Sequence, residues 1–222
     1  MLRVDFHTHT FASPDSLAQP TDLLRWMERK GLDRIVITDH NTLSGARQAF
    51  QLDPQRFIIG EEILTTGGEL LAVFVKEEIP KGLPYPKAIA RLIEQDAFIS
   101  VSHPFDRTRN GAWELPDLLA ILPAIDAIEV FNARCMLPNA NKLAKDFAEQ
   151  HHLPVTAGSD AHAAFELGAA CLRLPDFHDA ASLRHAILQG QVEGRMSPGW
   201  VHFVSLFARM RKMKNSRQRK AT

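Results

Sequence analysis

The chain alternates between short apolar runs and segments with helical periodicity. Eight runs rich in Val, Ile and Phe have the length and composition of buried strands. These predicted strands are Leu2–Phe6, Arg34–Thr38, Phe57–Gly60, Leu70–Val75, Phe98–Ser102, Ile125–Phe131, Val155–Gly158 and Ala169–Leu174. The segments between them predict helices: one from near Pro20 to a cap at Gly31, then Leu43–Phe50, Lys87–Gln95, Glu114–Leu122, Ala140–His151 and Ala180–Gln189.

Alternating strands and helices are typical of parallel β-α-β units. We therefore expect an α/β fold, with a closed or nearly closed β/α barrel favoured and an open doubly wound sheet as the alternative. Neither GxGxxG nor GxxxxGK[ST] occurs, so the sequence offers no glycine-rich phosphate loop. The pair Gly67 and Gly68 predicts a hairpin turn instead.

Composition and charge fit one globular domain with a distinct end. The 222 residues are 45% hydrophobic, which allows a substantial core, and the formal net charge is zero. Seven Lys or Arg residues and no acidic residue lie between Arg209 and Thr222. We predict one domain over residues 1–208 and a flexible basic tail over residues 209–222. Such a tail is a solvated terminus, or it contacts RNA, anionic lipid or an acidic partner.

The cysteines and the hydropathy of the sequence indicate the cellular compartment of the protein. Cys135 and Cys171 form no CxxC pair, which predicts two reduced thiols at or near the core. The first residues do not have the pattern of a signal peptide, and no apolar run approaches the roughly 18–20 residues of a membrane helix. We expect a cytoplasmic protein with no membrane partner.

Polar residues follow six of the predicted strands. They are His7 and His9, Asp39 and His40, Glu61 and Glu62, His103, Asn132, and Asp160 and His162. The C-terminal ends of parallel barrel strands open on one face, so these side chains should converge there. Five histidines at such positions are difficult to explain by packing alone.

The residue types indicate metal binding. Imidazoles and carboxylates without thiolates suit Zn, Mn or Fe. His7 and His9 are two residues apart on an extended chain and point to the same side, and Asp160 and His162 repeat that spacing. Glu62, Asp160 and the five histidines exceed the shell of one ion, so two or three divalent ions are expected. A bridging carboxylate, for which Glu62 is the best candidate, would hold a pair about 3.5–4 Å apart.

Several residues have a structural alternative. Asp15 is either a turn residue after Pro14 or a ligand from the loop after the first strand. Asp39 should support or cap its neighbours, because residues adjacent on a strand point apart. The remaining histidines lie away from the strand ends and are expected outside the site: His151, His152, His178, His185 and His202.

These residues and the stretches around them resemble the PHP (polymerase and histidinol phosphatase) family, in its small stand-alone form. The matching stretches are DFHTHTFASPDS, ITDHNTLSG, GEEILTTGGELLAVF, SHPFD, IEVFNAR and AGSDAH, in family order from residue 5 to residue 162. The resemblance implies a distorted seven-stranded β/α barrel of PHP/TIM-like type, with a two- or three-metal site at the C-terminal strand ends.

The resemblance also implies which residues bind each metal ion. It implies one ion held by His7, His9, Glu62 and Asp160, a second held by Glu62 and His103, and a third held by Asp15, His40 and His162. Glu69 stands where many relatives have a histidine for the second ion. It is either a carboxylate ligand there or points away, in which case the second ion is weak or absent.

The resemblance implies hydrolysis of a phosphate ester, most simply a phosphomonoester of a nucleotide or small metabolite. The residues expected to take part in catalysis are Asp160, His162, His40 and Arg134. Arg134 could clamp a phosphate, as could Arg107 and Arg109. A small phosphorylated substrate is the expected partner, and nucleic acid is possible. Two alternatives remain: a nuclease guided by the basic tail, and a non-catalytic metal-binding scaffold. A barrel amidohydrolase would call for a strand-end lysine, which the cluster lacks.

Overall fold

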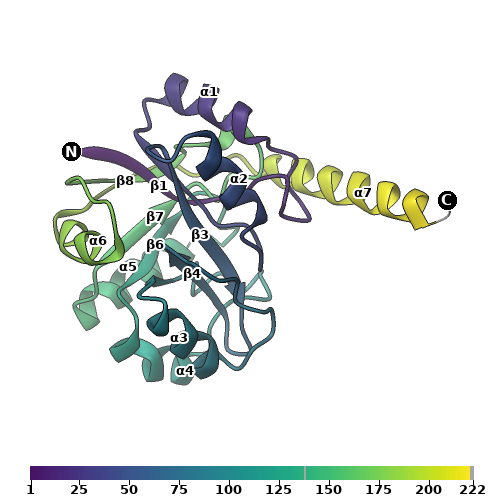
Figure 1. The fold of residues 1–222 in the computed structure, drawn as a ribbon. Coiled ribbons are helices and arrows are strands. Elements are labelled where there is room, and N and C mark those ends of the chain that lie inside the picture. Colours follow the sequence, from purple (N-terminus) through teal and green to yellow (C-terminus); the bar gives the residue numbers. More distant parts are fainter. Residues whose placement is uncertain (138, 221–222) are drawn as a thin grey trace.

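The computed structural model describes residues 1–137 and 139–220, folded around one nine-stranded sheet (Figure 1). The order across the sheet is β7-β6-β5-β4-β3-β2-β1-β8-β9, so sequential strands are mostly neighbours. The strands are β1 (Leu2–Thr8), β2 (Arg34–Ile37), β3 (Phe57–Leu64), β4 (Glu69–Val73), β5 (Phe98–Val101), β6 (Ala127–Asn132), β7 (Val155–Gly158), β8 (Ala170–Leu174) and β9 (Gln191–Gly194).

Helices lie around the outside of this sheet (Figure 1). They are α1 (Pro20–Lys30), α2 (Ser44–Leu52), α3 (Tyr85–Glu94), α4 (Leu115–Ile121), α5 (Ala140–His151), α6 (Ala180–Ala186) and α7 (Val201–Lys220), with 3-10 turns η1 (Leu122–Ala124), η2 (Ala164–Glu166) and η3 (Ile187–Gln189). Local sequence fixes the ends of α1: Pro20 opens it, and Gly31 ends it in the left-handed conformation, with φ 62°.

Strand direction gathers the polar strand ends on one side. β1, β2 and β3 are parallel, as are β5, β6 and β7, whereas β4 is antiparallel to both of its neighbours. The β3–β4 hairpin turns at the predicted Gly67–Gly68 pair and places Glu69 opposite Leu64. The beginning of β4 therefore lies at the same end of the sheet as the C-terminal ends of the parallel strands.

The sheet curls until β1 and the end of β7 meet at that same end. The backbone NH of Asp160 donates to the carbonyl of His7 at 2.7 Å, and the NH of His9 donates to the carbonyl of Ala161 at 2.9 Å. Gly158 permits this approach, since a Cβ there would lie 2.2 Å from the Cβ of His7. These two hydrogen bonds form a short seam between β1 and the end of β7. The seam turns β1 to β7 into a nearly closed barrel.

The structure confirms an α/β barrel-like fold but corrects the expected seven strands to nine. β8 pairs antiparallel with the first residues of β1, and β9 extends the sheet from β8. β9 escaped prediction because its sequence, QVEG, contains no apolar run and lies at an exposed edge. The antiparallel β4 also departs from the expected parallel units, and the open doubly wound sheet is not the architecture found.

The last helix was not predicted. α7 runs through the expected boundary between residues 208 and 209, so the backbone is helical on both sides of it. Val201 and Ala208 are buried against the barrel. The proposed division into a domain and a flexible tail stays a prediction, because helicity does not measure mobility.

Candidate metal centre

Nine side chains of metal-binding type gather at the C-terminal end of the barrel. They are His7, His9, Asp15, His40, Glu62, Glu69, His103, Asp160 and His162. Each comes from β1, β3, β4 or a loop that follows a strand. The sequence predicted these nine residues as ligands, and the structure places them together. Which ion each residue would bind stays a prediction.

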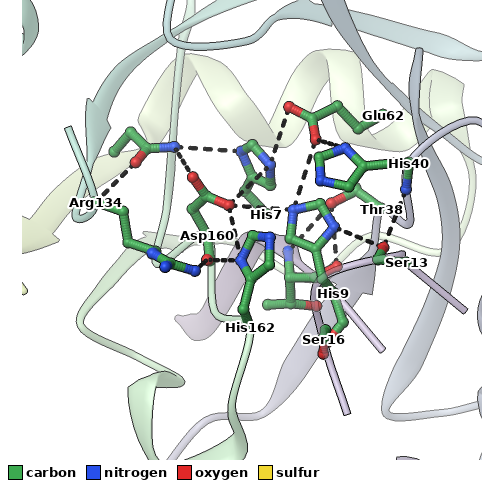
Figure 2. A network of polar contacts seen from close by, with 12 residues as sticks. His7, His9, Ser13, Ser16, Thr38, His40, Glu62, Arg134, Asp160 and His162 are labelled. Carbon is green, nitrogen blue, oxygen red and sulfur yellow. Dashed lines mark hydrogen bonds and ion pairs between the residues drawn. The ribbon is translucent and has the colours of Figure 1, made fainter. Parts of the chain in front are cut away.

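Glu62 is almost completely buried, and its carboxylate faces the imidazoles of His7, His9 and His40 (Figure 2). Its carboxylate oxygens lie 2.8 Å from His40 Nδ1, 3.1 Å from His103 Nε2, 3.3 Å from His7 Nε2 and 3.6 Å from His9 Nε2. A carboxylate within reach of four imidazoles has the placement expected of a bridging ligand. The neighbouring Glu61 faces away, where its Oε2 accepts the backbone NH of Ile79 at 3.0 Å.

Asp160 occupies the other side of the cluster (Figure 2). Its Oδ1 lies 3.1 Å from His9 Nε2 and 3.6 Å from His7 Nε2, which joins the first strand to the segment after β7. The backbone of Asp160 is left-handed, with φ 54°, a conformation that Asp tolerates better than most residues. This local turn directs the carboxylate back over the end of β1.

A third group lies toward the mouth of the site. Asp15 Oδ1 lies 3.3 Å from His162 Nε2 and 3.5 Å from His40 Nε2. The ring centroids of His162 and His40 are 4.2 and 4.4 Å from that of His9. Asp15 therefore behaves as a member of the cluster and not only as a turn residue.

The structure contains sets of three donor atoms at spacings that a metal ion could span. Within each set the candidate atoms lie within 4.8 Å of one another. The sets are His7–His9–Asp160, His7–Glu62–His103, His9–His40–His162 and His40–Glu62–Glu69. They overlap in the way expected for neighbouring ions that share ligands.

Buried polar atoms test whether metal ions fit this site. Among the described residues, His7 Nε2, Asp15 Oδ1 and Glu62 Oε2 are buried and make no well-directed hydrogen bond, although another titratable group of the cluster lies within 3.3 Å of each. Buried polar atoms are almost always satisfied, so three such atoms in one cluster call for an explanation. Imidazole nitrogen and carboxylate oxygen are suitable donors to divalent metal ions. The residues present therefore fit such ions.

Residues around the cluster orient the imidazoles. Glu129 Oε1 lies 3.0 Å from His7 Nδ1, and Ser13 Oγ lies 3.1 Å from His9 Nδ1. Asn132 Nδ2 donates to Glu129 Oε2 at 3.2 Å. A partner on Nδ1 leaves Nε2 facing the site, as is usual for metal-binding histidines. Sequence reasoning missed Glu129 and Ser13, although the acid inside the otherwise apolar AIEVF was a signal for Glu129.

Asp39 has the supporting role that its position next to His40 predicted. Its Oδ1 accepts the backbone NH of Thr10 at 2.7 Å and the hydroxyl of Ser13 at 2.6 Å, and its Oδ2 accepts the hydroxyl of Thr10 at 2.6 Å. Asp39 therefore fixes the loop after β1, and through Ser13 it fixes the ring of His9.

Charge and burial act in opposite directions on the acids of the cluster. Burial alone would raise the pKa of Glu62, but the imidazoles of His7 and His40 lower this pKa well below its usual value. Burial likewise opposes ionisation of Asp160, yet the Arg109 guanidinium holds the pKa of that carboxyl well below its usual range. Both groups should therefore be carboxylates at neutral pH, the form that binds metal ions.

Glu69 points toward the cluster and not away from it. Its Oε2 lies 3.6 Å from His103 Nε2. Gly111 lies directly against this carboxylate, since a Cβ there would come within 1.9 Å of Oε2. Burial, and then the charge of Glu62, raise the pKa of Glu69. Of the two readings that the sequence left open, the structure places Glu69 inward.

A pocket of about 700 Å³ opens over the cluster. Its basic lining residues are Lys81, Arg109, Arg134 and Arg209, and His202 also lines it, although the sequence placed His202 outside the site. A second pocket, of about 650 Å³, lies at Phe74 and Phe177 and is lined by none of the nine candidate ligands.

The three candidate arginines have different surroundings. Arg109 Nη1 lies 2.6 Å from Asp160 Oδ2, directly at the cluster. Arg134 is 3% exposed and donates to Ser205 Oγ at 2.8 Å and to the carbonyl of Val201 at 3.2 Å. Arg107 is paired with Glu114 at the surface.

Comparison with known proteins matches two segments of the chain to family models. The model described as the PHP domain matches residues 5–63, and the model described as PHP-associated matches residues 138–192. An uncharacterised protein of Methanocaldococcus jannaschii is 33% identical over 180 residues, which are 80% of this chain and 72% of the relative.

Solved structures share the fold at lower identity. A candidate metal-dependent phosphoesterase from Bifidobacterium adolescentis has a TM-score of 0.64 and 18% identity, covering 85% of this chain and 96% of that one. PsfC from Pseudomonas syringae has a TM-score of 0.66 and 19% identity, covering 96% and 99%. At such identities the likeness speaks for the fold alone.

Proposed function

The chain belongs to the PHP family, and on that premise we propose that it is a metal-dependent phosphoesterase that hydrolyses the phosphomonoester of a small molecule. The observation that carries the proposal is the buried carboxylate of Glu62, which lies within 3.6 Å of four imidazoles. One of these imidazoles, that of His40, lines the pocket. A buried carboxylate among imidazoles favours metal binding over packing, because burial of a charge destabilises the fold unless a partner compensates it.

The proposed ligands are the nine clustered residues, with Zn, Mn or Fe as the ions and two or three ions in all. Divalent ions at such a site supply hydroxide near neutral pH and stabilise the charge that develops on phosphoryl oxygens. Glu62 and Asp160 hold negative charge at the base of the site. Glu129 and Ser13 fix the ring orientations of His7 and His9.

Basic residues of the pocket would bind the phosphate. We assign this contact to Arg109, whose side chain is 23% exposed and reaches the cluster at Asp160. Its guanidinium also donates to Asp106 and to the carbonyl of Arg134, so it would exchange part of these contacts for phosphoryl oxygens. Arg134, one of the three clamps that the sequence offered, is a positioning residue in this proposal, because it is 3% exposed and its guanidinium donates to α7.

A proton donor to the leaving oxygen would complete the reaction. His40 and His162 stand at the mouth of the cluster and share Asp15 as a partner. If two ions bind and leave one of these imidazoles without metal, that imidazole could be protonated and donate its proton to the leaving oxygen, which departs as the alcohol. The pocket volume of about 700 Å³ suits a small phosphorylated molecule.

The proposal is tested by a matched pair of substitutions. Glu62→Gln removes the central charge, and we expect turnover of a phosphomonoester to fall by more than the roughly 10–100-fold typical of a supporting residue. Glu61→Gln is the control: burial raises the pKa of Glu61 to about 8, so that group is mostly neutral at pH 7 and an amide resembles it. Metal content by elemental mass spectrometry should fall in the first variant only.

The substrate screen should contain small phosphomonoesters, a phosphodiester and an oligonucleotide. Turnover of the small monoesters by the Mn-, Zn- or Fe-loaded protein is the expected result. Cleavage of the oligonucleotide alone would favour the nuclease alternative. Metal binding without turnover of any ester would favour the scaffold alternative, and activity kept by Glu62→Gln would refute the site assignment.

A further inference from the structure

α7 is attached to the barrel by one face. Val201 and Ala208 are buried on this face. One turn further along, the ammonium of Lys212 donates to the backbone carbonyls of Phe11 and Ser13. These contacts hold the first three turns of the helix beside the loop after β1, and the remainder projects from the body of the molecule (Figure 1).

The opposite face of α7 carries an apolar stripe that faces solvent. Its members are Phe203, Leu206, Phe207, Met210 and Met213, each more than half exposed, and Phe203 reaches 72%. The spacing of three, four, seven and ten residues places all five on one side of a helix. Single exposed apolar residues are ordinary, but a continuous stripe of long side chains indicates an interaction surface.

Positive charge borders the stripe. At 100° per residue, Arg209 and Arg211 lie on opposite sides of it, and Lys214 lies at its far end. The sequence contains no Asp or Glu from Arg195 to its last residue. The surface thus combines exposed aromatic and aliphatic side chains with neighbouring charges that are all positive.

We propose that α7 binds the surface of an anionic phospholipid bilayer. The stripe would lie at the boundary of headgroups and acyl chains, and the bordering arginines would contact lipid phosphates, as in other interfacial helices. In this proposal α7 lies along the bilayer surface. No helix in the described part of the chain is long and apolar enough to cross a membrane. This proposal departs from the expectation of no membrane partner. That expectation considered the basic residues of the tail and not the apolar stripe beside them.

Other occupants fit this surface less well. A second copy would bring two helices of the same sign together without any acidic residue to compensate. Nucleic acid would pair with the arginines but would leave the five apolar side chains exposed to water. His202 and Arg209, on one border of the stripe, also line the pocket wall, so binding would hold the pocket mouth beside the lipid.

Vesicle flotation tests the proposal. The full chain should float with vesicles of phosphatidylcholine mixed with phosphatidylglycerol and not with phosphatidylcholine alone. Phe203→Ser with Phe207→Ser should weaken partitioning onto the vesicles by about tenfold or more, because two rings that would be buried in the bilayer are lost. The matched control is Ile93→Ser with Leu188→Ser, at exposed apolar positions on α3 and η3, which should bind as the parent does.

Charge reversal separates the electrostatic contribution. Arg211→Glu with Lys214→Glu should abolish preference for the anionic vesicles. Lys142→Glu with Lys145→Glu, two exposed positions on α5, should leave it unchanged. Circular dichroism and metal content confirm that each variant is folded.

Four results would overturn the proposal. The first is no flotation with anionic vesicles, and the second is flotation unchanged by the serine pair. The third is a dimer in light scattering that the serine pair dissociates, which would assign the stripe to a second copy. The fourth is binding of an oligonucleotide that depends on Phe203 and Phe207, which would assign the stripe to nucleic acid.

Discussion

At the scale of single residues, the site is a set of atoms whose roles are fixed by what each side chain contacts away from the cluster. His7 shows this most clearly. Its Nδ1 faces Glu129 and its Nε2 is buried without a hydrogen bond. The ring is thus held by one nitrogen so that the other is available, which is how proteins prepare a histidine for a metal ion.

Substitution of Glu129 tests this arrangement. Glu129→Gln keeps the shape but removes the charge that holds the ring of His7, so we expect metal affinity to fall by roughly 10–100-fold. Competition with a chromophoric chelator measures it. Glu114→Gln, at an exposed surface pair, should retain the parent affinity. An unchanged affinity in Glu129→Gln would mean that His7 needs no partner on Nδ1.

The thiols offer a second test at this scale. Both cysteines are free and buried, in agreement with the prediction of reduced core thiols. Burial raises the pKa of Cys171 to about 12, so almost no thiolate exists at pH 8, and the thiolate is the reactive form. We expect a disulfide reagent to titrate two thiols in guanidinium and none in the native protein over minutes. Rapid native labelling of Cys171→Ser would identify Cys135 as accessible.

At the scale of elements, the strand ends position the ligands. The places of Glu69 and of the ligands at the seam depend on how the strands are directed and paired. Glu69 opens an antiparallel strand, yet it lies among residues that close parallel ones, because the tight hairpin returns the chain at once. The short seam between β1 and β7 likewise brings His7, His9 and Asp160 together from opposite ends of the sequence.

The close approach of β1 and β7 at Gly158 allows us to predict the effect of adding one methyl group there. Gly158→Ala would place a Cβ 2.2 Å from the Cβ of His7, so β1 and β7 must separate. We expect a loss of about 1–3 kcal/mol in unfolding free energy, together with reduced metal content. Urea denaturation measures the first. Gly199→Ala is the control, since a Cβ there meets nothing within 4 Å. Equal stability of the two variants would show that the seam yields without cost.

At the scale of the whole molecule, bound ions would connect β1, β3, β4 and the segments after β2, β5 and β7. The barrel is closed by few hydrogen bonds at this end, so ions shared among these segments should stabilise the closed form. Ligands that bind only the folded state raise stability, by about 2.7 kcal/mol at a hundredfold excess over Kd.

Metal removal should therefore lower the melting temperature. We expect chelation by EDTA to lower Tm in calorimetry and added Mn²⁺ or Zn²⁺ to restore it. EDTA already saturated with the ion found in the protein controls for the chelator itself. An identical Tm before and after verified metal removal would show that the fold closes without the ions.

Much of the fold and the composition of the site could be read from local pattern. Apolar runs located eight of the nine strands, since a buried strand must be apolar, and the residues just after the runs supplied most of the cluster. Glu129 was missed because it lies inside a strand, and Ser13 because a serine in a loop has no distinguishing pattern. β9 was missed because QVEG contains no apolar run, and α7 because its apolar residues are interspersed with the basic residues of a segment interpreted as a tail.

The sequence by itself determined the α/β class, the ligand types and the strand ends that carry them, because these follow from local patterning and side-chain chemistry. Only the tertiary structure decided the nine strands, the antiparallel β4 and the inward Glu69, since register and direction depend on pairing between distant segments. It also decided the two faces of α7. A mixed apolar and basic segment becomes a stripe with basic borders only when the barrel takes one side of the helix and leaves the other exposed.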